Sequence, residues 1–157
     1  MKPLIFNISF IFLMACSAGK HSESGHKEDA IPWSPNYKLS WADYKGRPSR
    51  DQDDHIAART NCRFGIKING THVDVTSEFI ATRSNVRPGQ QTPSLLAHEQ
   101  LHFDITWLVA LRFRKKVTQM ELTADDYDSI IQYEYIESFR EMNRLQEAYD
   151  RETNHGI

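Results

Sequence analysis

The pattern of apolar and polar residues divides the chain into a β-like part and a helical part. Residues 58–68 and 72–81 form two runs with strand-like alternation, and these runs are joined at Asn69-Gly70. This dipeptide is typical of a two-residue hairpin, because both of its positions tolerate a positive φ. An earlier stretch, residues 37–41, also alternates and is expected to form a short strand. The sequence therefore predicts a small antiparallel or mixed sheet ahead of the helical part.

The helical part begins with one long helix. Thr92 can cap this helix and Pro93 suits its first position, and the helical period extends to about Lys116. Apolar residues cover nearly its whole circumference, which is typical of a helix buried at the centre of a domain. We therefore expect this helix to pack centrally, against the predicted sheet.

A second long helix is expected to follow. It should begin after Thr123, with Asp126 in a capping-box-like position, and extend close to residue 151. Residues 154–156 then mark its end. Together the segments predict an α+β fold, in which a small antiparallel or mixed sheet is followed by two long helices.

The first sixteen residues have the proportions of a secretory signal peptide. Lys2 supplies a positive charge and residues 4–14 are mostly apolar, but a membrane-spanning helix needs about 20 apolar residues. The segment ends in Leu13-Met14-Ala15-Cys16, which resembles the lipobox of bacterial lipoproteins. The resemblance implies that Cys16 is lipidated and anchors an exported protein in the cell envelope, on its periplasmic or surface side. An ordinary signal peptide with an incidental cysteine is the alternative.

The mature chain is expected to consist of a tether and one domain. Residues 17–30 contain no large apolar side chain and cannot bury enough surface to fold, so we expect a flexible tether. The folded domain is then expected over residues 31–157. Once Cys16 is set aside, Cys62 is the remaining cysteine, so the domain needs no internal disulfide, and Cys62 is expected to be a small buried side chain.

The charge of the chain gives no indication of a nucleic-acid partner. The 157 residues include 19 Lys and Arg against 21 Asp and Glu, for a formal net charge of −2. Nucleic-acid-binding domains usually carry a clear excess of basic residues. We therefore expect no nucleic acid among the partners.

The first predicted helix carries the motif His98-Glu99-Gln100-Leu101-His102. Residues four apart lie on one helical face, so His98 and His102 can bind the same Zn²⁺ ion. Glu99 is rotated off that face and can reach a zinc-bound water, whose proton it would accept as a general base. The alternative is that both histidines are satisfied by hydrogen bonds in the core, although burying such groups without a partner costs several kcal/mol.

Two longer strings resemble a bacterial family described as zinc-dependent proteases and classed mainly as a domain of unknown function. The strings are residues 95–105, with His98-Glu99-Gln100 followed by His102-Phe103-Asp104, and residues 149–156, with Glu152-Thr153-Asn154-His155. The resemblance covers roughly residues 41–156 and implies a zincin-like domain with one zinc ion. It does not identify the substrate.

The third protein ligand of the predicted zinc site is open. Catalytic zinc sites usually have three protein ligands and a water. The family resemblance favours His155, and Glu152 is the first alternative. Glu134 and Glu141 on the second helix are further carboxylates of the same kind, whereas Glu137 and Glu147 are expected to lie on a solvated helix face.

Several polar residues outside the predicted zinc ligands also have expected roles. Asp104 should point away from the metal and hold the first helix against the strands. Tyr149 and Arg151 are candidates for stabilising an oxyanion, because they neighbour the candidate third ligands. His55 and His72 have no visible partner in the sequence and are expected to be solvated or locally hydrogen-bonded.

The function that these residues predict is zinc-dependent hydrolysis, with peptides as the first substrate class. Residues 72–81 are expected to form an edge strand that pairs with an extended substrate. Two alternatives are an amidase that acts on peptidoglycan stem peptides and a non-catalytic zinc-binding envelope lipoprotein. A water-bearing coordination position would favour an enzyme, and a closed one would favour the binding protein.

Overall fold

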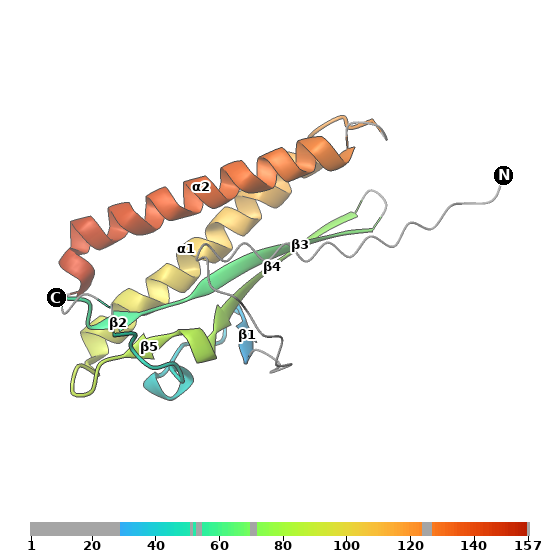
Figure 1. Cartoon of the computed structure of the whole chain (residues 1–157). Helices are drawn as coiled ribbons and strands as arrows, with labels where there is room; N and C mark the ends of the chain where they lie inside the picture. Colours follow the sequence, from blue (N-terminus) through green and yellow to red (C-terminus); the bar gives the residue numbers. More distant parts are fainter. Residues whose placement is uncertain (1–28, 51, 53–54, 70–71, 124–126, 157) are drawn as a thin grey trace.

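A computed structural model describes residues 29–50, 52, 55–69, 72–123 and 127–156 (Figure 1). The predicted signal peptide, the lipobox cysteine and most of the predicted tether lie outside these residues. The described strands and long helices are, in chain order, β1 (Ala30–Pro32), β2 (Ala58–Arg59), β3 (Cys62–Asn69), β4 (His72–Ile80), β5 (Asn85–Val86), α1 (Pro93–Thr118) and α2 (Tyr127–Thr153). None of the helices in the described ranges is both long enough and apolar enough to cross a membrane.

The larger sheet has three antiparallel strands in the order β1-β4-β3. β3 and β4 pair from Cys62 opposite Phe79 to Asn69 opposite His72, which confirms the predicted hairpin. Asn69 is the last residue of β3, and its predicted turn partner Gly70 lies outside the described residues. The alternation along these two strands places Phe64 and Val73 in the core beneath the helices.

The predicted edge strand 72–81 is wrong in its position, because β4 is the central strand of the sheet. β1 pairs with its last three residues, from Pro32 opposite Glu78 to Ala30 opposite Ile80. The Trp33 backbone N–H extends this contact by donating to the Ser77 carbonyl oxygen at 2.8 Å. The backbone of this half of β4 is therefore not available for pairing with a substrate.

Two further strand predictions need correction. The run 58–68 is divided into β2 and β3, because Asn61 turns toward a loop residue: its N–H donates to Ser84 Oγ at 2.9 Å. Residues 37–40 form no strand and lead into a single 3₁₀ turn, Trp41–Asp43. Asp43 accepts hydrogen bonds from both the backbone and the side chain of Ser40, and such local bonding competes with strand formation.

The two helices form as predicted. Thr92 caps α1, since its hydroxyl accepts a hydrogen bond from the Leu95 backbone N–H at 3.1 Å, and Pro93 occupies the first helical turn. α1 is not buried all round, however: Leu101 is 46% exposed and Leu108 is 43% exposed. The segment around the predicted cap Asp126 of α2 lies outside the described residues.

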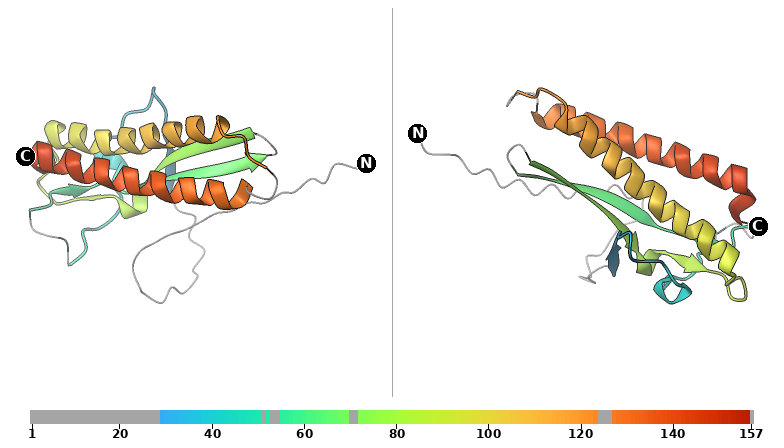
Figure 2. Two further views of the ribbon diagram at one scale, coloured as in Figure 1. Left: turned by 90° about the horizontal axis from the view of Figure 1, so that it is seen from above. Right: turned by 180° about the vertical axis from the view of Figure 1, so that it is seen from behind.

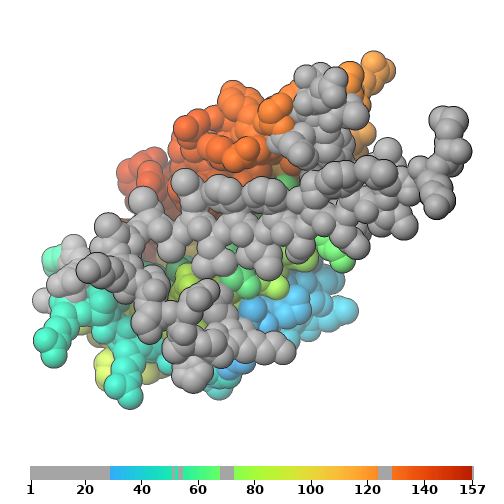
Figure 3. Space-filling view, turned by 45° about the vertical axis from the view of Figure 1, so that its right-hand side comes forward, coloured from blue at the N-terminus to red at the C-terminus, as the bar shows by residue number. Residues whose placement is uncertain are grey.

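α1 packs on the sheet and α2 runs antiparallel along α1, so that the start of α1 and the end of α2 lie at the same end of the molecule (Figures 1 and 2). The space-filling view shows α2 on one side of the molecule and the residues of the N-terminal strand on the other (Figure 3). One apolar cluster joins both helices to the sheet; its buried residues are Phe64, Val73, Val109, Ala110, Phe113, Val117, Ile131 and Met142. This core fixes the register of α2 against α1, and with it the geometry of the end where the two helices meet.

Candidate metal centre

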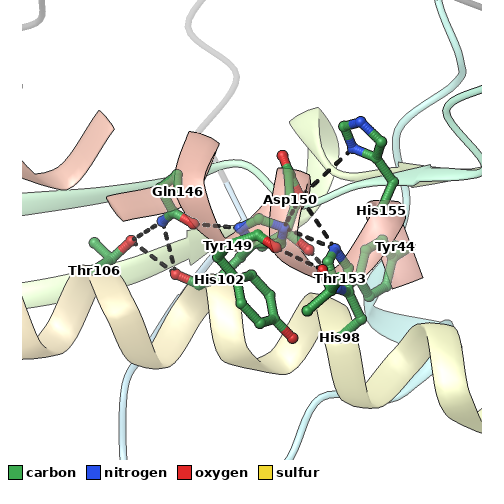
Figure 4. Close-up of polar contacts among 10 residues, drawn as sticks. Tyr44, His98, His102, Thr106, Gln146, Tyr149, Asp150, Thr153 and His155 are labelled. Atoms are coloured by element: carbon green, nitrogen blue, oxygen red, sulfur yellow. Dashed lines mark hydrogen bonds and ion pairs between the residues drawn. The ribbon is translucent and has the colours of Figure 1, made fainter. Parts of the chain in front are cut away.

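Three side chains that could hold a metal ion converge where α1 begins and α2 ends (Figure 4). His98 and His102 lie one turn apart on the same face of α1, as the motif spacing requires. Asp150 comes from α2 and faces them. The antiparallel packing of the helices therefore supplies the third group from a residue 48 positions or more along the chain.

The distances among the three converging atoms match those of a tetrahedral metal site. His98 Nε2 and His102 Nε2 are 3.1 Å apart, and Asp150 Oδ1 lies 3.2 Å from the first and 2.9 Å from the second. Ligand bonds of 2.0–2.1 Å to a tetrahedral Zn²⁺ would place ligand atoms about 3.3 Å from one another. The three atoms thus have the spacing of three corners of such a site.

The protonation of His98 suits metal binding. His98 is 5% exposed, and burial, with a smaller contribution from the neighbouring His102, lowers its pKa. The neutral imidazole is the form that ligates metals. Asp150 opposes this shift only in part, so His98 favours its neutral form.

Glu99 is buried beside the three converging groups, with 3% of its surface exposed. Burial raises its pKa, while hydrogen bonds from Thr60 lower it and the charge of Asp150 raises it further. The Tyr44 hydroxyl and Thr60 Oγ1 are 2.7 Å apart, so a hydrogen bond with Tyr44 holds Thr60 in place. Glu99 Oε2 has no hydrogen-bond partner among the described residues.

A buried carboxylate oxygen without a partner costs about 1–3 kcal/mol of stability, more if it is charged. Such an atom therefore indicates a missing partner, such as a water held by a metal. The donor set of two imidazole nitrogens and one carboxylate oxygen is one that Zn²⁺ accepts in catalytic sites. By both criteria the residues fit one zinc ion.

An aromatic ring closes one side of the site. Tyr149 stacks on His98 with ring centroids 4.6 Å apart and an interplanar angle of 16°. The rings of Tyr149 and His102 meet edge to face, with their centroids 5.2 Å apart. Burial raises the pKa of Tyr149, with smaller contributions from the charges of Glu99 and Asp150. The tyrosine therefore keeps its proton at neutral pH and remains a hydrogen-bond donor.

A groove of about 360 Å³ lies beside Asp150, at the end of α2 and the turn that follows it. Its lining residues are Glu147, Asp150, Arg151, Asn154 and His155. Because Asp150 belongs to both the groove and the converging group, a molecule in the groove would lie next to the candidate metal ligands. Arg151, predicted as an oxyanion candidate, is exposed in this groove rather than packed beside the histidines.

The structure brings His98, Glu99 and His102 together but separates the candidates for the third ligand. His155 is half-exposed, and its Nδ1 lies 3.7 Å from Asp150 Oδ1, outside the group of three. Glu152 is exposed on α2 and is not part of the group. Glu134 and Glu141 pair instead with Lys116 and Arg112, each at 2.5 Å.

Sequence reasoning did not single out Asp150. Its signal is helical spacing: residues 146, 150 and 153 fall on one face of α2, and the last two of them lie within the second string of the family resemblance. Recognising it required the register of α2 against α1. Among the described residues, no other Asp, Glu, His or Cys joins the group.

Three remaining predictions have clear outcomes. Asp104 points away from the metal, as predicted, and its carboxylate accepts hydrogen bonds from Trp33 at 2.8 Å and Gln100 at 3.0 Å. It therefore fastens α1 to the segment after β1. Cys62, predicted to be buried, is partly buried, and this burial raises the pKa of its thiol. His55 is exposed, and the side chain of His72 lies outside the described part of the structure.

Comparison with known proteins identifies the family of the chain but assigns it no function. No curated protein and no solved structure matches it. A family profile described as "Bacterial protein of unknown function (DUF922)" matches residues 20–156. This range includes the site residues of both α1 and α2. The chain therefore belongs to the DUF922 family of bacterial proteins.

Proposed function

We propose that this protein is a zinc-dependent hydrolase that cleaves peptide bonds. His98, His102 and Asp150 are the proposed zinc ligands, and Glu99 is the proposed general base. The observation that carries the proposal is the buried Glu99 Oε2, which lacks a hydrogen-bond partner among the described residues and lies one helical position from a candidate ligand. A structural metal site has no use for such an atom, whereas a hydrolase does.

The proposed mechanism follows from the surroundings of Glu99. Bound zinc would supply Lewis-acid activation of water, lowering its pKa to about 7. Glu99 Oε2 would accept the proton of the attacking water, while Thr60, which the Tyr44 hydroxyl contacts, hydrogen-bonds to the carboxylate. Burial raises the pKa of Glu99, so its protonated form is a competent donor to the departing amine.

The groove beside Asp150 supports an enzyme rather than a non-catalytic zinc protein. Structural zinc sites are closed by four protein ligands, whereas catalytic sites keep one position open. Here three protein groups converge, and a groove of about 360 Å³ reaches one of them. Peptides are the proposed substrate class because of the resemblance to zinc-dependent proteases, and peptidoglycan stem peptides belong to the same chemical class.

We also propose that the protein is exported and held in the cell envelope by a lipid on Cys16. The support is the string Leu13-Met14-Ala15-Cys16 after an apolar segment with the length of a signal peptide. Cys16→Ala should leave the protein unprocessed or release it from the membrane fraction. A variant that stays in the membrane at the mature size would contradict lipidation at this residue.

The role of Glu99 is tested by Glu99→Gln, with Glu152→Gln as a matched control on an exposed position. Glu99→Gln keeps the size of the side chain but cannot accept a proton, so cleavage should fall by about 10²–10⁴-fold, the scale of a lost general base. Zinc content should stay at one per chain, and Glu152→Gln should behave as the unchanged protein. The measurement is zinc content and cleavage of a broad peptide panel, including stem peptides, with and without a chelator.

Two outcomes would contradict the proposal. Unchanged cleavage by a folded, zinc-loaded Glu99→Gln variant would reject Glu99 as the base. Failure of the zinc-loaded, unchanged protein to cleave any member of the panel would reject peptide hydrolysis and favour a non-catalytic zinc protein.

A further inference from the structure

Each of the three proposed ligands has a different contact from the end of α2 or the turn that follows it (Figure 4). His102 contacts Gln146, His98 contacts Thr153, and Asp150 contacts His155. Thr153 and His155 belong to the second string of the family resemblance, in which the proposed function gives a role to Asp150 but not to these two residues. These three contacts indicate what that string does.

Gln146 fixes which nitrogen of His102 carries a proton. Its Nε2 donates to the His102 carbonyl oxygen at 2.9 Å and to Thr106 Oγ1 at 3.3 Å, so the orientation of the amide is set. The amide oxygen Oε1 therefore faces His102 Nδ1 and can only accept. In the neutral imidazole, His102 Nδ1 would then carry the proton, which leaves the Nε2 lone pair directed at the candidate metal site.

Thr153 does the same for His98. The single hydroxyl proton of Thr153 is donated to the Tyr149 carbonyl oxygen at 2.6 Å. Toward His98 Nδ1, 3.2 Å away, the hydroxyl oxygen can then only accept. With Nδ1 protonated in the neutral imidazoles, both histidines would direct Nε2 lone pairs toward Asp150 Oδ1, an arrangement that a cation would stabilise.

The turn after α2 brings His155 and Gly156 to the same site. Asn154, His155 and Gly156 have φ of 50°, 55° and 79°, and the left-handed region costs a non-glycine residue roughly 1 kcal/mol. Gly156 packs on His98 so closely that a Cβ would lie 2.8 Å from His98 Cγ. Strained turns of this kind persist where the surroundings require them, and here the turn places His155 Nδ1 3.7 Å from Asp150 Oδ1.

We propose that Gln146, Thr153 and His155 are positioning residues of the metal site, one for each ligand, and that His155 is not itself a ligand. The proposal rests on the ligand set of the proposed function. Outer partners that orient metal ligands typically contribute 10–100-fold to metal affinity. The second family string then has a physical role: it orients the imidazole of His98 and faces the carboxylate of Asp150.

The test is the affinity for Zn²⁺, measured by competition with a chromophoric chelator. Gln146→Leu and Thr153→Val should bind one zinc ion about 10–100-fold more weakly. Thr153→Ser keeps the acceptor and should bind within about threefold of the unchanged protein. Gln132→Leu, an exposed glutamine on the same helix, is the matched control and should have no effect.

His155→Gln separates positioning from ligation. It should still bind one zinc ion, with an affinity reduced by no more than about tenfold, the lower part of the range for an outer partner. Loss of zinc as complete as in His98→Ala would make His155 a ligand and overturn the proposal. Equal affinities for Gln146→Leu, Gln132→Leu and the unchanged protein would overturn it as well, while leaving the proposed function intact.

A second measurement uses the zinc-free protein and needs no metal. The imidazole ¹⁵N shifts of His98 and His102 should report protonation at Nδ1, and Gln146→Leu should remove this preference from His102 alone. If Gln146→Leu does not fold by circular dichroism, Gln146→Met takes its place with the same expectation. Protonation of His102 at Nε2 in the unchanged protein would overturn the role of Gln146. Absence of zinc binding by that protein would instead reject the proposed function.

Discussion

The two ends of the α1–α2 pair both place acidic groups between the helices, but only one end provides them with basic partners. At the end away from the candidate metal centre, called the far end, Lys116 pairs with the buried Glu134 and Arg112 pairs with Glu141. At the end that holds the candidate metal centre, called the near end, the ion-pair contacts of Asp150 among the described residues are with His98, His102 and His155. Glu99 beside them has a carboxylate oxygen with no partner in the same part of the chain.

From this contrast we infer which end is structurally complete. Buried acids in a finished helix interface are paired, because an unpaired buried charge is costly. The near end has two acids, and burial holds the neighbouring His98 toward its uncharged form. The divalent cation that we propose would supply positive charge there. In this account the far end stabilises the fold alone, and the near end is the proposed metal site.

The largest expected effect separates the two ends by metal binding. His102→Ala or Asp150→Ala should weaken zinc binding by more than about 100-fold, beyond the range of outer partners, since two ligands seldom hold zinc tightly. Glu141→Gln at the far end should leave the affinity unchanged. The measurement is chelator competition on all three variants. Tight zinc binding by both near-end variants would remove the distinction between the ends.

The second expected effect is stabilisation by zinc. At a free zinc concentration 100 times the Kd, binding should stabilise the fold by about 2.7 kcal/mol. For a chain of this length that corresponds to a rise of about 5–10 °C in Tm. Thermal unfolding with zinc and with a chelator measures it. His98→Ala should show no such difference, and an equal rise in that variant would place the bound zinc elsewhere.

The third effect concerns the turn that packs on His98, with a second glycine as its control. Gly156→Ala forces a Cβ to within 2.8 Å of His98 Cγ at a positive φ, so it should lower both stability, by about 1–3 kcal/mol, and zinc affinity. Gly89→Ala is at φ +83° with open space around it and should cost only about 1 kcal/mol, without changing zinc binding. Thermal unfolding and zinc titration of both variants measure the contrast. Identical zinc affinities would show that the turn does not support His98.

The smallest effect is expected at the far end. Lys116→Ala removes the partner of buried Glu134, but the lysine side chain is 55% exposed and solvent screens the pair. We expect a loss of about 1 kcal/mol or less in the free energy of unfolding, with unchanged zinc affinity. Denaturant unfolding and zinc titration test this. A change in zinc affinity would mean that the two ends are coupled through the helices.

The parts of the site that lie on one helix could be predicted from the sequence. The spacing of His98 and His102 depends only on the helical period, and Thr92-Pro93 marks where that helix begins. The β3–β4 hairpin was predictable for a similar reason, because its pairing is between neighbours in the chain. Zinc binding and hydrolysis at this site stay predictions.

The parts that depend on packing between distant segments could not be predicted. Asp150 meets His98 only through the register of α2 against α1, which no local pattern encodes. β1 is short and ends in Pro32, and its pairing with β4 made that strand central rather than an edge. The acids Glu134 and Glu141 were reasonable ligand candidates until packing placed them beside Lys116 and Arg112.

The most direct test of the account is anomalous diffraction at the zinc edge from a crystal of the zinc-loaded protein. The account predicts one anomalous peak per chain, bonded at about 2.0–2.2 Å to His98 Nε2, His102 Nε2 and an Asp150 carboxylate oxygen, with His155 unbound. A peak bonded to His155 in place of Asp150, or no peak between α1 and α2, would contradict it.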